Sequence, residues 1–177
     1  MRGPRGRKEA VRVAFVAGAL AFGALARADS TNVRLHGAPG MAVRQAVEGA
    51  LLRLERPGCQ QVLSDFRDAP GRTLQDALDE LGETPASYLR QLVFFYDGAS
   101  QRRCASGEIL GGTQPGSRVV YVCPRQFFEA YRRDTLLAEV FIIHETLHSL
   151  GLGENPPASL EITQRVMTRC SERAALD

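Results

Sequence analysis

The sequence predicts an α+β fold, a small single domain with a short, mostly antiparallel sheet and two disulfides. Three observations support this prediction. Much of the chain has the apolar spacing of helices, whereas two segments, 88–96 and 118–123, contain the short continuous apolar runs of strands. The chain contains 4 cysteines, and an even number is typical of disulfides in an exported protein. No repeat or shift in composition marks a second domain.

Residues 1–28 have the features of a secretory signal peptide, which leaves residues 29–177 as the folded domain. Basic residues come first, an apolar run follows at residues 13–25, and Ala26-Arg27-Ala28 fits a small-residue cleavage site. The apolar run is shorter than the ~20 residues that span a bilayer. We therefore expect a secreted or periplasmic protein without stable membrane insertion.

The charge balance argues against a nucleic-acid partner. The whole chain has 22 Lys+Arg and 20 Asp+Glu, but six of the basic residues and one acidic residue lie in the first 28 positions. The remaining chain has 16 basic and 19 acidic residues, so its formal charge is −3. It lacks the basic surface that binds nucleic acids.

The first predicted helix covers residues 41–56, where apolar residues recur every three or four positions before Pro57-Gly58. The preceding residues, 29–40, are polar and contain glycine and proline, so we expect them to be loosely held. The short apolar segment 59–66 is ambiguous and could form one more helical turn.

A second helix is predicted after Thr73, which can cap it, and Gly82 ends it. Pro85 can start a further helical turn. The apolar and aromatic run within residues 88–96 precedes Asp97-Gly98, which is typical of a buried strand and a turn.

Residues 99–117 are polar and rich in glycine, so they predict a long loop or an open hairpin. Long ordered loops in compact domains are often functional. The second strand is predicted at residues 118–123, and Pro124 can open a helix over residues 125–133.

The most apolar helix is predicted at residues 135–150, with Asp134 as its cap. It has two stripes at helical spacing, one wholly apolar and one that changes from apolar residues to two histidines. Because it carries few charges, we expect most of its surface to be buried. The last helix is predicted at residues 160–173 with Ser159 as its cap, and Met167 within it is expected to be a core residue.

The chemistry is concentrated in the H-E-x-x-H pattern of His144, Glu145 and His148. Residues four apart lie on one face of a helix, so both histidines can bind one metal ion. Glu145 lies beside them, where it can reach a water on that metal. Gly151 can end the helix in a left-handed conformation, and the chain can then bring Glu154 back to the same ion. Two histidines, a carboxylate and a water form a catalytic zinc site with an open position.

From His144 to Glu154 the sequence reads H-E-x-x-H-x-x-G-x-x-E, which resembles the extended zinc motif of the metzincin-type zinc peptidases. That family has a histidine where this chain has Glu154. The resemblance implies a zincin-like domain with a zinc-binding active-site helix and a Zn²⁺ cofactor. Glu154 has the spacing of the third ligand, and Glu161 is the alternative, because other zincins use a downstream glutamate. Glu161 could instead support a histidine ligand as a hydrogen-bond partner.

The resemblance also implies a function. We expect an exported zinc-dependent metallopeptidase that hydrolyses peptide bonds through a zinc-activated water, with Glu145 as the general base and a peptide or protein as the substrate. Two alternatives stay open: a catalytically inactive zincin scaffold that serves as a secreted binding module, and a zinc amidase that acts on cell-wall peptides. Glu145 argues against the inactive scaffold, because a structural metal site needs no base.

Three further expectations concern the surroundings of the motif. Of the possible disulfide pairings we favour Cys59–Cys104 and Cys123–Cys170. Tyr121 and Arg118 are candidates for the group that stabilises the transition state. By analogy with zincins, either predicted strand, 118–123 or 88–96, could be the edge that pairs with an extended substrate.

Overall fold

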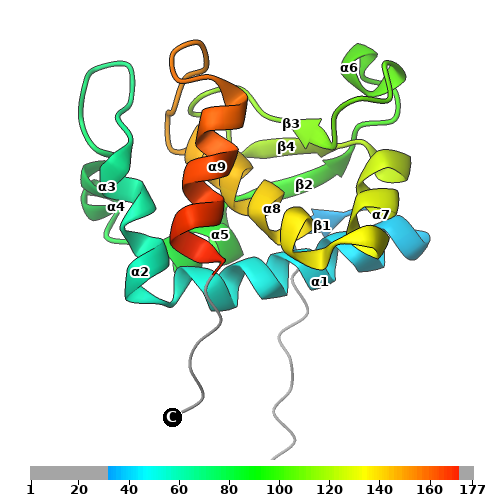
Figure 1. The fold of residues 1–177 in the computed structure, drawn as a ribbon, viewed down its shortest axis with the longest axis horizontal. Helices are drawn as coiled ribbons and strands as arrows, with labels where there is room; N and C mark the ends of the chain where they lie inside the picture. Colours follow the sequence, from blue (N-terminus) through cyan, green and yellow to red (C-terminus); the bar gives the residue numbers. More distant parts are fainter. Residues whose placement is uncertain (1–31, 172–177) are drawn as a thin grey trace, which may run out of the picture.

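The computed structural model describes residues 32–171, so the predicted signal peptide lies outside the described residues. The helices and strands follow the chain in Figure 1 in this order: β1 (Val33–Arg34), α1 (Gly37–Leu54), α2 (Pro57–Gln60), α3 (Val62–Asp65), α4 (Leu74–Leu81), α5 (Pro85–Leu92), β2 (Phe94–Asp97), α6 (Arg102–Ala105), β3 (Gly111–Gly112), β4 (Val119–Val122), α7 (Pro124–Arg133), α8 (Thr135–Ser149) and α9 (Ser159–Cys170). The α+β class is confirmed. None of the helices within the described range is both long and apolar enough to cross a membrane.

The sheet has the strand order β1-β2-β4-β3, and its pairing is mixed. β1 pairs in parallel with β2, and β2 pairs in parallel with β4, whereas β3 is antiparallel to β4. The prediction of a mostly antiparallel sheet is therefore wrong. The helices α1–α5 lie between β1 and β2 in the chain, and such a long crossover returns the chain to the same end of the sheet and makes parallel pairing possible.

The two sequence-predicted strands lie in the middle of the sheet rather than at its edge, and the first is shorter than predicted because residues 88–92 belong to α5. β2 and β4 are each paired on both sides, so neither can offer a free edge to a substrate. The edge strands are β1 and β3, and both are only two residues long. The antiparallel edge strand, β3, comes from the glycine-rich segment that the sequence assigns to a loop or an open hairpin.

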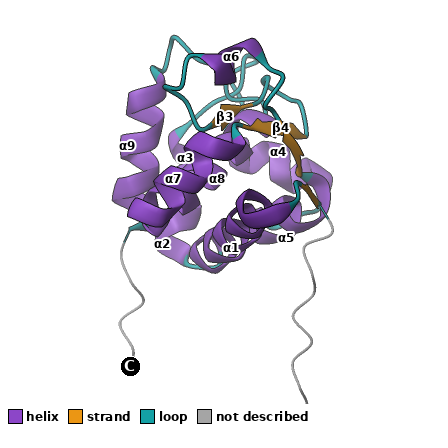
Figure 2. Cartoon of the chain, turned by 90° about the vertical axis from the view of Figure 1, so that its right-hand side faces the viewer, coloured by secondary structure: helices purple, strands orange, loops and turns teal. Residues whose placement is uncertain are grey.

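The core lies between one face of the sheet and the helices α1 and α8, which Figure 1 shows on the same side of it. This inner face of the sheet carries the fully buried residues Phe95, Val120 and Val122. The outer face carries Tyr96 and Tyr121, which are 39% and 38% exposed. Figure 2 shows α6 and its loops at the opposite end of the molecule from α1, next to β3.

The segment before α1 is more ordered than the sequence predicts. Val33 and Leu35 are buried, β1 joins the sheet, and α1 begins at Gly37. Gly40 explains the close packing, because a Cβ there would lie only 2.4 Å from the Leu35 backbone oxygen. The expectation of a loosely held segment is wrong for residues 32–40.

Most of the predicted helix ends are confirmed. Thr73 and Asp76 form a reciprocal capping box at the start of α4, and Gly82 ends that helix with φ 67°. The Asp134 carboxylate accepts from the backbone N–H groups of residues 136 and 137 and so caps α8. The predicted cap of α9 is wrong by one residue, because Ser159 is already helical and Ala158 occupies the cap position.

The disulfides join Cys59 to Cys170 and Cys104 to Cys123, so the predicted pairing is wrong. The first connects α2 to the end of α9, which pack against each other. The second joins α6 to the residue that follows β4. Two disulfides indicate that the protein belongs in an oxidising, extracytoplasmic compartment.

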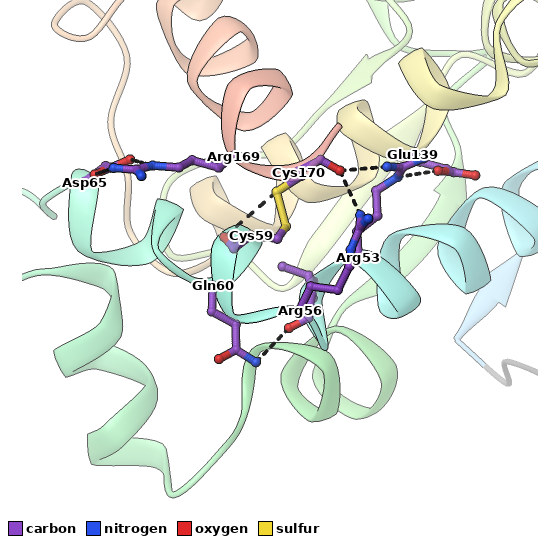
Figure 3. The surroundings of a disulfide bond; sticks show 9 residues. Arg53, Arg56, Cys59, Gln60, Asp65, Glu139, Arg169 and Cys170 are labelled. Atoms are coloured by element: carbon purple, nitrogen blue, oxygen red, sulfur yellow. Dashed lines mark hydrogen bonds and ion pairs between the residues drawn. A yellow bond between two sulfur atoms is a disulfide. The ribbon is translucent and has the colours of Figure 1, made fainter. Parts of the chain in front are cut away.

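Figure 3 shows that the Cys59–Cys170 disulfide lies within a network of ion pairs and hydrogen bonds. Arg53 of α1 donates to Glu139 of α8 at 2.5 Å and to the Cys170 backbone oxygen at 2.6 Å. Arg169 of α9 pairs with Asp65 of α3 at 2.8 Å. This network fixes α9 against the rest of the domain, and α9 in turn supplies a residue to the candidate site.

Candidate metal centre

The three motif residues His144, Glu145 and His148 lie on the last turns of α8, next to the wholly buried stripe formed by Val140, Ile143 and Leu147. The adjacent face is covered by α9 and by the turn after α8, where Thr163 contacts His144 and Leu152 contacts His148. His144 and His148 are only 5% and 4% exposed. Burial of both imidazoles in an apolar helix requires that their nitrogens have partners.

The turn after α8 brings Glu154 back to the histidines. Gly151 has φ 110°, its N–H donates to the His148 oxygen, and the Leu152 N–H donates to the Leu147 oxygen. These two hydrogen bonds form a Schellman motif, in which glycine adopts the left-handed conformation at little cost. The predicted role of Gly151 is confirmed.

The potential ligand atoms of His144, His148 and Glu154 converge on one point. The two Nε2 atoms are 3.0 Å apart, and Glu154 Oε1 lies 3.4 Å from His148 Nε2 and 3.8 Å from His144 Nε2. A triangle with these sides has a circumradius of about 2.0 Å, which equals the usual length of bonds from zinc to nitrogen and oxygen, about 2.0–2.2 Å. The two buried histidines and the half-exposed Glu154 carboxylate could therefore hold a metal ion.

The other ring nitrogens of both histidines are hydrogen-bonded. His148 Nδ1 lies 2.7 Å from the Leu152 backbone oxygen, which can only accept, so Nδ1 carries the proton and Nε2 keeps its lone pair. His144 Nδ1 lies 3.0 Å from the Thr163 hydroxyl of α9. Such partners fix the ring orientation of histidine ligands in metal sites.

The environment keeps His144 neutral. Burial, with a smaller contribution from neighbouring His148, lowers the pKa of His144 to about 4, although Glu154 acts in the opposite direction. A neutral imidazole is the form that binds metals. At neutral pH no proton has to leave His144 before a metal binds.

Glu145 is 5% exposed, and its Oε2 has no hydrogen-bond partner within the described residues. Burial, with a smaller contribution from the charge of Glu154, raises the pKa of Glu145 to about 8, although a hydrogen bond from the Thr113 backbone N–H and the positive charge of Arg103 act in the opposite direction. A buried carboxyl oxygen without a partner costs stability. Such a group beside a candidate metal site is typical of an active site.

The edge strand β3 runs beside Glu145. The Cys123 N–H donates to the Leu110 oxygen, so these two residues form a hydrogen-bonded pair, and Gly111 turns its own N–H and C=O towards the free edge. Thr113 lies two residues further along with the same orientation, and its N–H reaches Glu145. The free backbone groups of β3 therefore face the candidate site.

A cavity of about 250 Å³ adjoins the site below β3; we call it the inner cavity. Its walls are largely apolar. His144 and Glu145 belong to the lining, together with Glu108, Ile109, Leu110, Gly111, Leu137, Val140, Phe141, Ser159 and Thr163. The arrangement places an apolar pocket directly beside two of the motif residues.

Some sequence-predicted candidates lie away from this group. Glu161 is exposed on the first turn of α9, and the potential metal-binding group found among residues 32–171 does not include it. In the structure Thr163, rather than Glu161, is the hydrogen-bond partner of His144. Arg118 lies over the ring of Tyr88, 5.9 Å from the ring centre. Met167 packs against the core within α9, as predicted.

Sequence reasoning missed Thr163, Thr113 and Arg103. The segment that contains Thr113 could be recognised as a long glycine-rich loop, but its residues gave no indication of a β-edge. Thr163 lies four residues after Ser159 on α9, and only the packing of α9 on α8 brings it to His144.

The fold and the site define an α+β protein with two disulfides and a candidate metal centre on its most buried helix. Comparison with protein-family models, with curated proteins and with solved structures finds no significant match to this chain. Its function must therefore be inferred from the chemistry of the site.

Proposed function

We propose that this chain is an exported zinc-dependent metallopeptidase in which His144, His148 and Glu154 bind the metal and Glu145 is the general base. The observation that carries this proposal is the convergence of three ligand atoms beside a buried carboxyl group with an unsatisfied oxygen. A structural metal site would require only the first of these two features.

The donor set favours zinc over other common ions. Calcium and magnesium prefer sites built from oxygen atoms, whereas two imidazoles and one carboxylate are the protein ligands of known catalytic zinc sites. When bound, zinc lowers the pKa of a coordinated water to near ~7 and polarises a carbonyl group. Glu154 is 41% exposed at its side chain, so the ligand triangle has a side that is accessible to water and substrate.

The chain's own groups perform the proton transfers and the positioning. In its ionised form Glu145 accepts a proton from the attacking water and passes it to the leaving amine. The Thr113 N–H holds the Glu145 carboxylate, while Oε2 stays available for the transferred proton. An extended peptide can add to the free β3 edge through its main chain, and the inner cavity can accept one apolar side chain.

The first test is the zinc content of the protein, produced from the full sequence in a host that exports and oxidises it. We expect about one zinc per molecule in the native protein and in Glu161→Ala, and a large loss in Glu154→Ala. If the native protein takes up no zinc when zinc is supplied, the proposal is wrong. The histidines would then form a metal-free pair in which His144 Nε2–H donates to His148 Nε2.

The second test measures hydrolysis. Zinc-loaded protein should cleave peptides from a mixed fluorogenic library, and a chelator should abolish that cleavage until zinc is restored. Cleavage of cell-wall peptides alone would indicate the amidase. Zinc binding without hydrolysis of either substrate would indicate an inactive scaffold that serves as a binding module.

A further inference from the structure

A second cavity, of about 340 Å³, lies on the outer side of β3; we call it the outer cavity. Its described lining contains one charged residue, Arg103, and no acidic residue. The other lining residues are mostly polar: Gln101, Gly112, Thr113, Gln114, Ser117, Val119 and Tyr121. The outer cavity therefore offers a cation and neutral hydrogen-bonding groups, which suits an anionic group.

The backbone that carries Arg103 is anchored to the sheet and to α7. It lies on α6, and the Cys104–Cys123 disulfide joins that helix to the end of β4. The Gln126 side chain adds a hydrogen bond of 2.8 Å to the Cys104 oxygen. The position of the α6 backbone is thus fixed relative to the sheet.

The Arg103 guanidinium lies directly against β3. A Cβ at Gly112 would come within 2.3 Å of Arg103 Nη1, so only a glycine leaves room for the side chain in this position. Among residues 32–171 the guanidinium has no hydrogen-bond or ion-pair partner, although its charge is felt by Glu145. Its donors are therefore free to bind another molecule.

The two glycines of β3 face opposite sides of the sheet. A Cβ at Gly111 would meet Phe141 of α8 at 2.8 Å, whereas the Cβ direction of Gly112 meets Arg103. Side chains of an extended peptide alternate between the two faces in the same way. A peptide paired with this edge would therefore present one side chain to the inner cavity and a neighbouring one to Arg103.

We propose that Arg103 binds a carboxylate of the peptide, either an acidic side chain or the terminal carboxylate, and thereby sets the specificity of the site. A guanidinium offers a planar pair of donors that matches a carboxylate. The inference rests on the proposed function for the identity of the ligand as a peptide. It adds a preference for acidic peptides that the metal site alone does not require.

The test measures peptide binding rather than turnover, with the zinc-loaded Glu145→Gln variant as a non-cleaving background. The probes are fluorescein-labelled octapeptides that carry Glu or Gln at one position at a time, each with a free or an amidated C-terminus. We expect one position, or the terminal carboxylate, to improve binding about fivefold to tenfold. The two peptide series show which of the two sources supplies the carboxylate.

Three variants assign the preference to Arg103. Arg103→Gln should abolish it, and Gly112→Ala should reduce it because the new methyl group displaces the guanidinium. Arg102→Gln removes the neighbouring exposed arginine of α6 and should leave the preference unchanged. Equal binding of Glu and Gln peptides, or an unchanged preference in Arg103→Gln, would overturn the inference.

The same peptides separate this inference from the proposed function. If acidic peptides bind through Arg103 but the protein with Glu145 intact cleaves none of them, the metallopeptidase proposal fails and the binding specificity stands. If peptides are cleaved without regard to their acidic groups, the enzyme proposal stands and the role of Arg103 is wrong.

Discussion

Two glutamates on α8, Glu139 and Glu145, have opposite surroundings. Glu139 pairs with Arg53 of α1 and lies against Gly49, where any Cβ would come within 2.3 Å of its carboxylate. Glu145, less than two turns further along, is more deeply buried and keeps one oxygen without a partner. The comparison shows that the buried carboxylate near the start of α8, Glu139, is compensated by an ion pair. The buried carboxyl group near its end, Glu145, is only partly compensated.

The largest effect should come from replacing the carboxyl group by an amide at each position. Glu145→Gln should reduce kcat/KM for a cleaved peptide by on the order of 10²–10⁴-fold, because general acid–base catalysis contributes about that much. Glu139→Gln should change it less than about twofold. Steady-state kinetics with measured zinc content checks both. A Glu145→Gln enzyme with native activity would contradict the assignment of the base.

The second prediction concerns the partner of His144. Thr163→Val keeps the shape of the side chain but removes its hydroxyl, and the affinity for zinc should fall about 10–100-fold, as is usual when such a partner is lost. The matched control is Thr168→Val, since Thr168 is exposed on the same helix and its hydroxyl donates to the Gln164 backbone oxygen. Competition with a chelator of known affinity measures both. Equal losses in the two variants would indicate a general effect on α9.

Stability should respond in the opposite way from activity. Glu139→Gln breaks a largely buried pair with Arg53, so the free energy of unfolding should fall by about 1–3 kcal/mol. Glu145→Gln removes a buried carboxyl group that has an unsatisfied oxygen, so the metal-free protein should lose less stability or gain some. Denaturant titrations of the metal-free proteins compare them. The comparison of the two glutamates fails if Glu145→Gln proves the more destabilising change.

The smallest effect concerns pH. The hydrogen bond from Arg169 holds the pKa of Asp65 below its usual value, although burial acts in the opposite direction. The ionised Asp65 carboxylate therefore stabilises the folded protein above pH ~4, and this contribution is lost as the pH falls through the lowered pKa of Asp65. Asp65→Asn should cost about 0.5–1 kcal/mol near pH 7, and this difference should shrink in acid. Asp79→Asn, at an exposed position of α4, should show no such trend.

The candidate metal centre could be predicted from the sequence because its residues are close together in the chain. The residues concerned all lie between positions 144 and 154: His144, Glu145, His148, Gly151 and Glu154. Helix geometry and one glycine turn are enough to bring them together. The α8 and α4 caps were predictable for the same reason, since a cap depends on residues that are adjacent in sequence.

The sheet direction and the disulfides could not be predicted because they depend on distant packing. Cys59 and Cys170 are 111 residues apart, and only the docking of α9 on α2 makes them neighbours. β1 and β3 have two residues each, too few for an apolar alternation to be recognised. β3 in addition consists of glycine alone, which disfavours strands in general but allows close approach of Arg103 on one face and Phe141 on the other.

Leu152 connects the end of α8 with the candidate metal site. Its N–H completes the Schellman turn, its carbonyl accepts from His148, and its backbone also bridges to Asp68. Folding of the turn thus orders the imidazole before any ion arrives, and the conformational entropy of that ordering is lost during folding rather than during metal binding. The end of α8 therefore determines the orientation of the His148 ring. A sequence change that alters how α8 ends would alter metal affinity without changing a ligand residue.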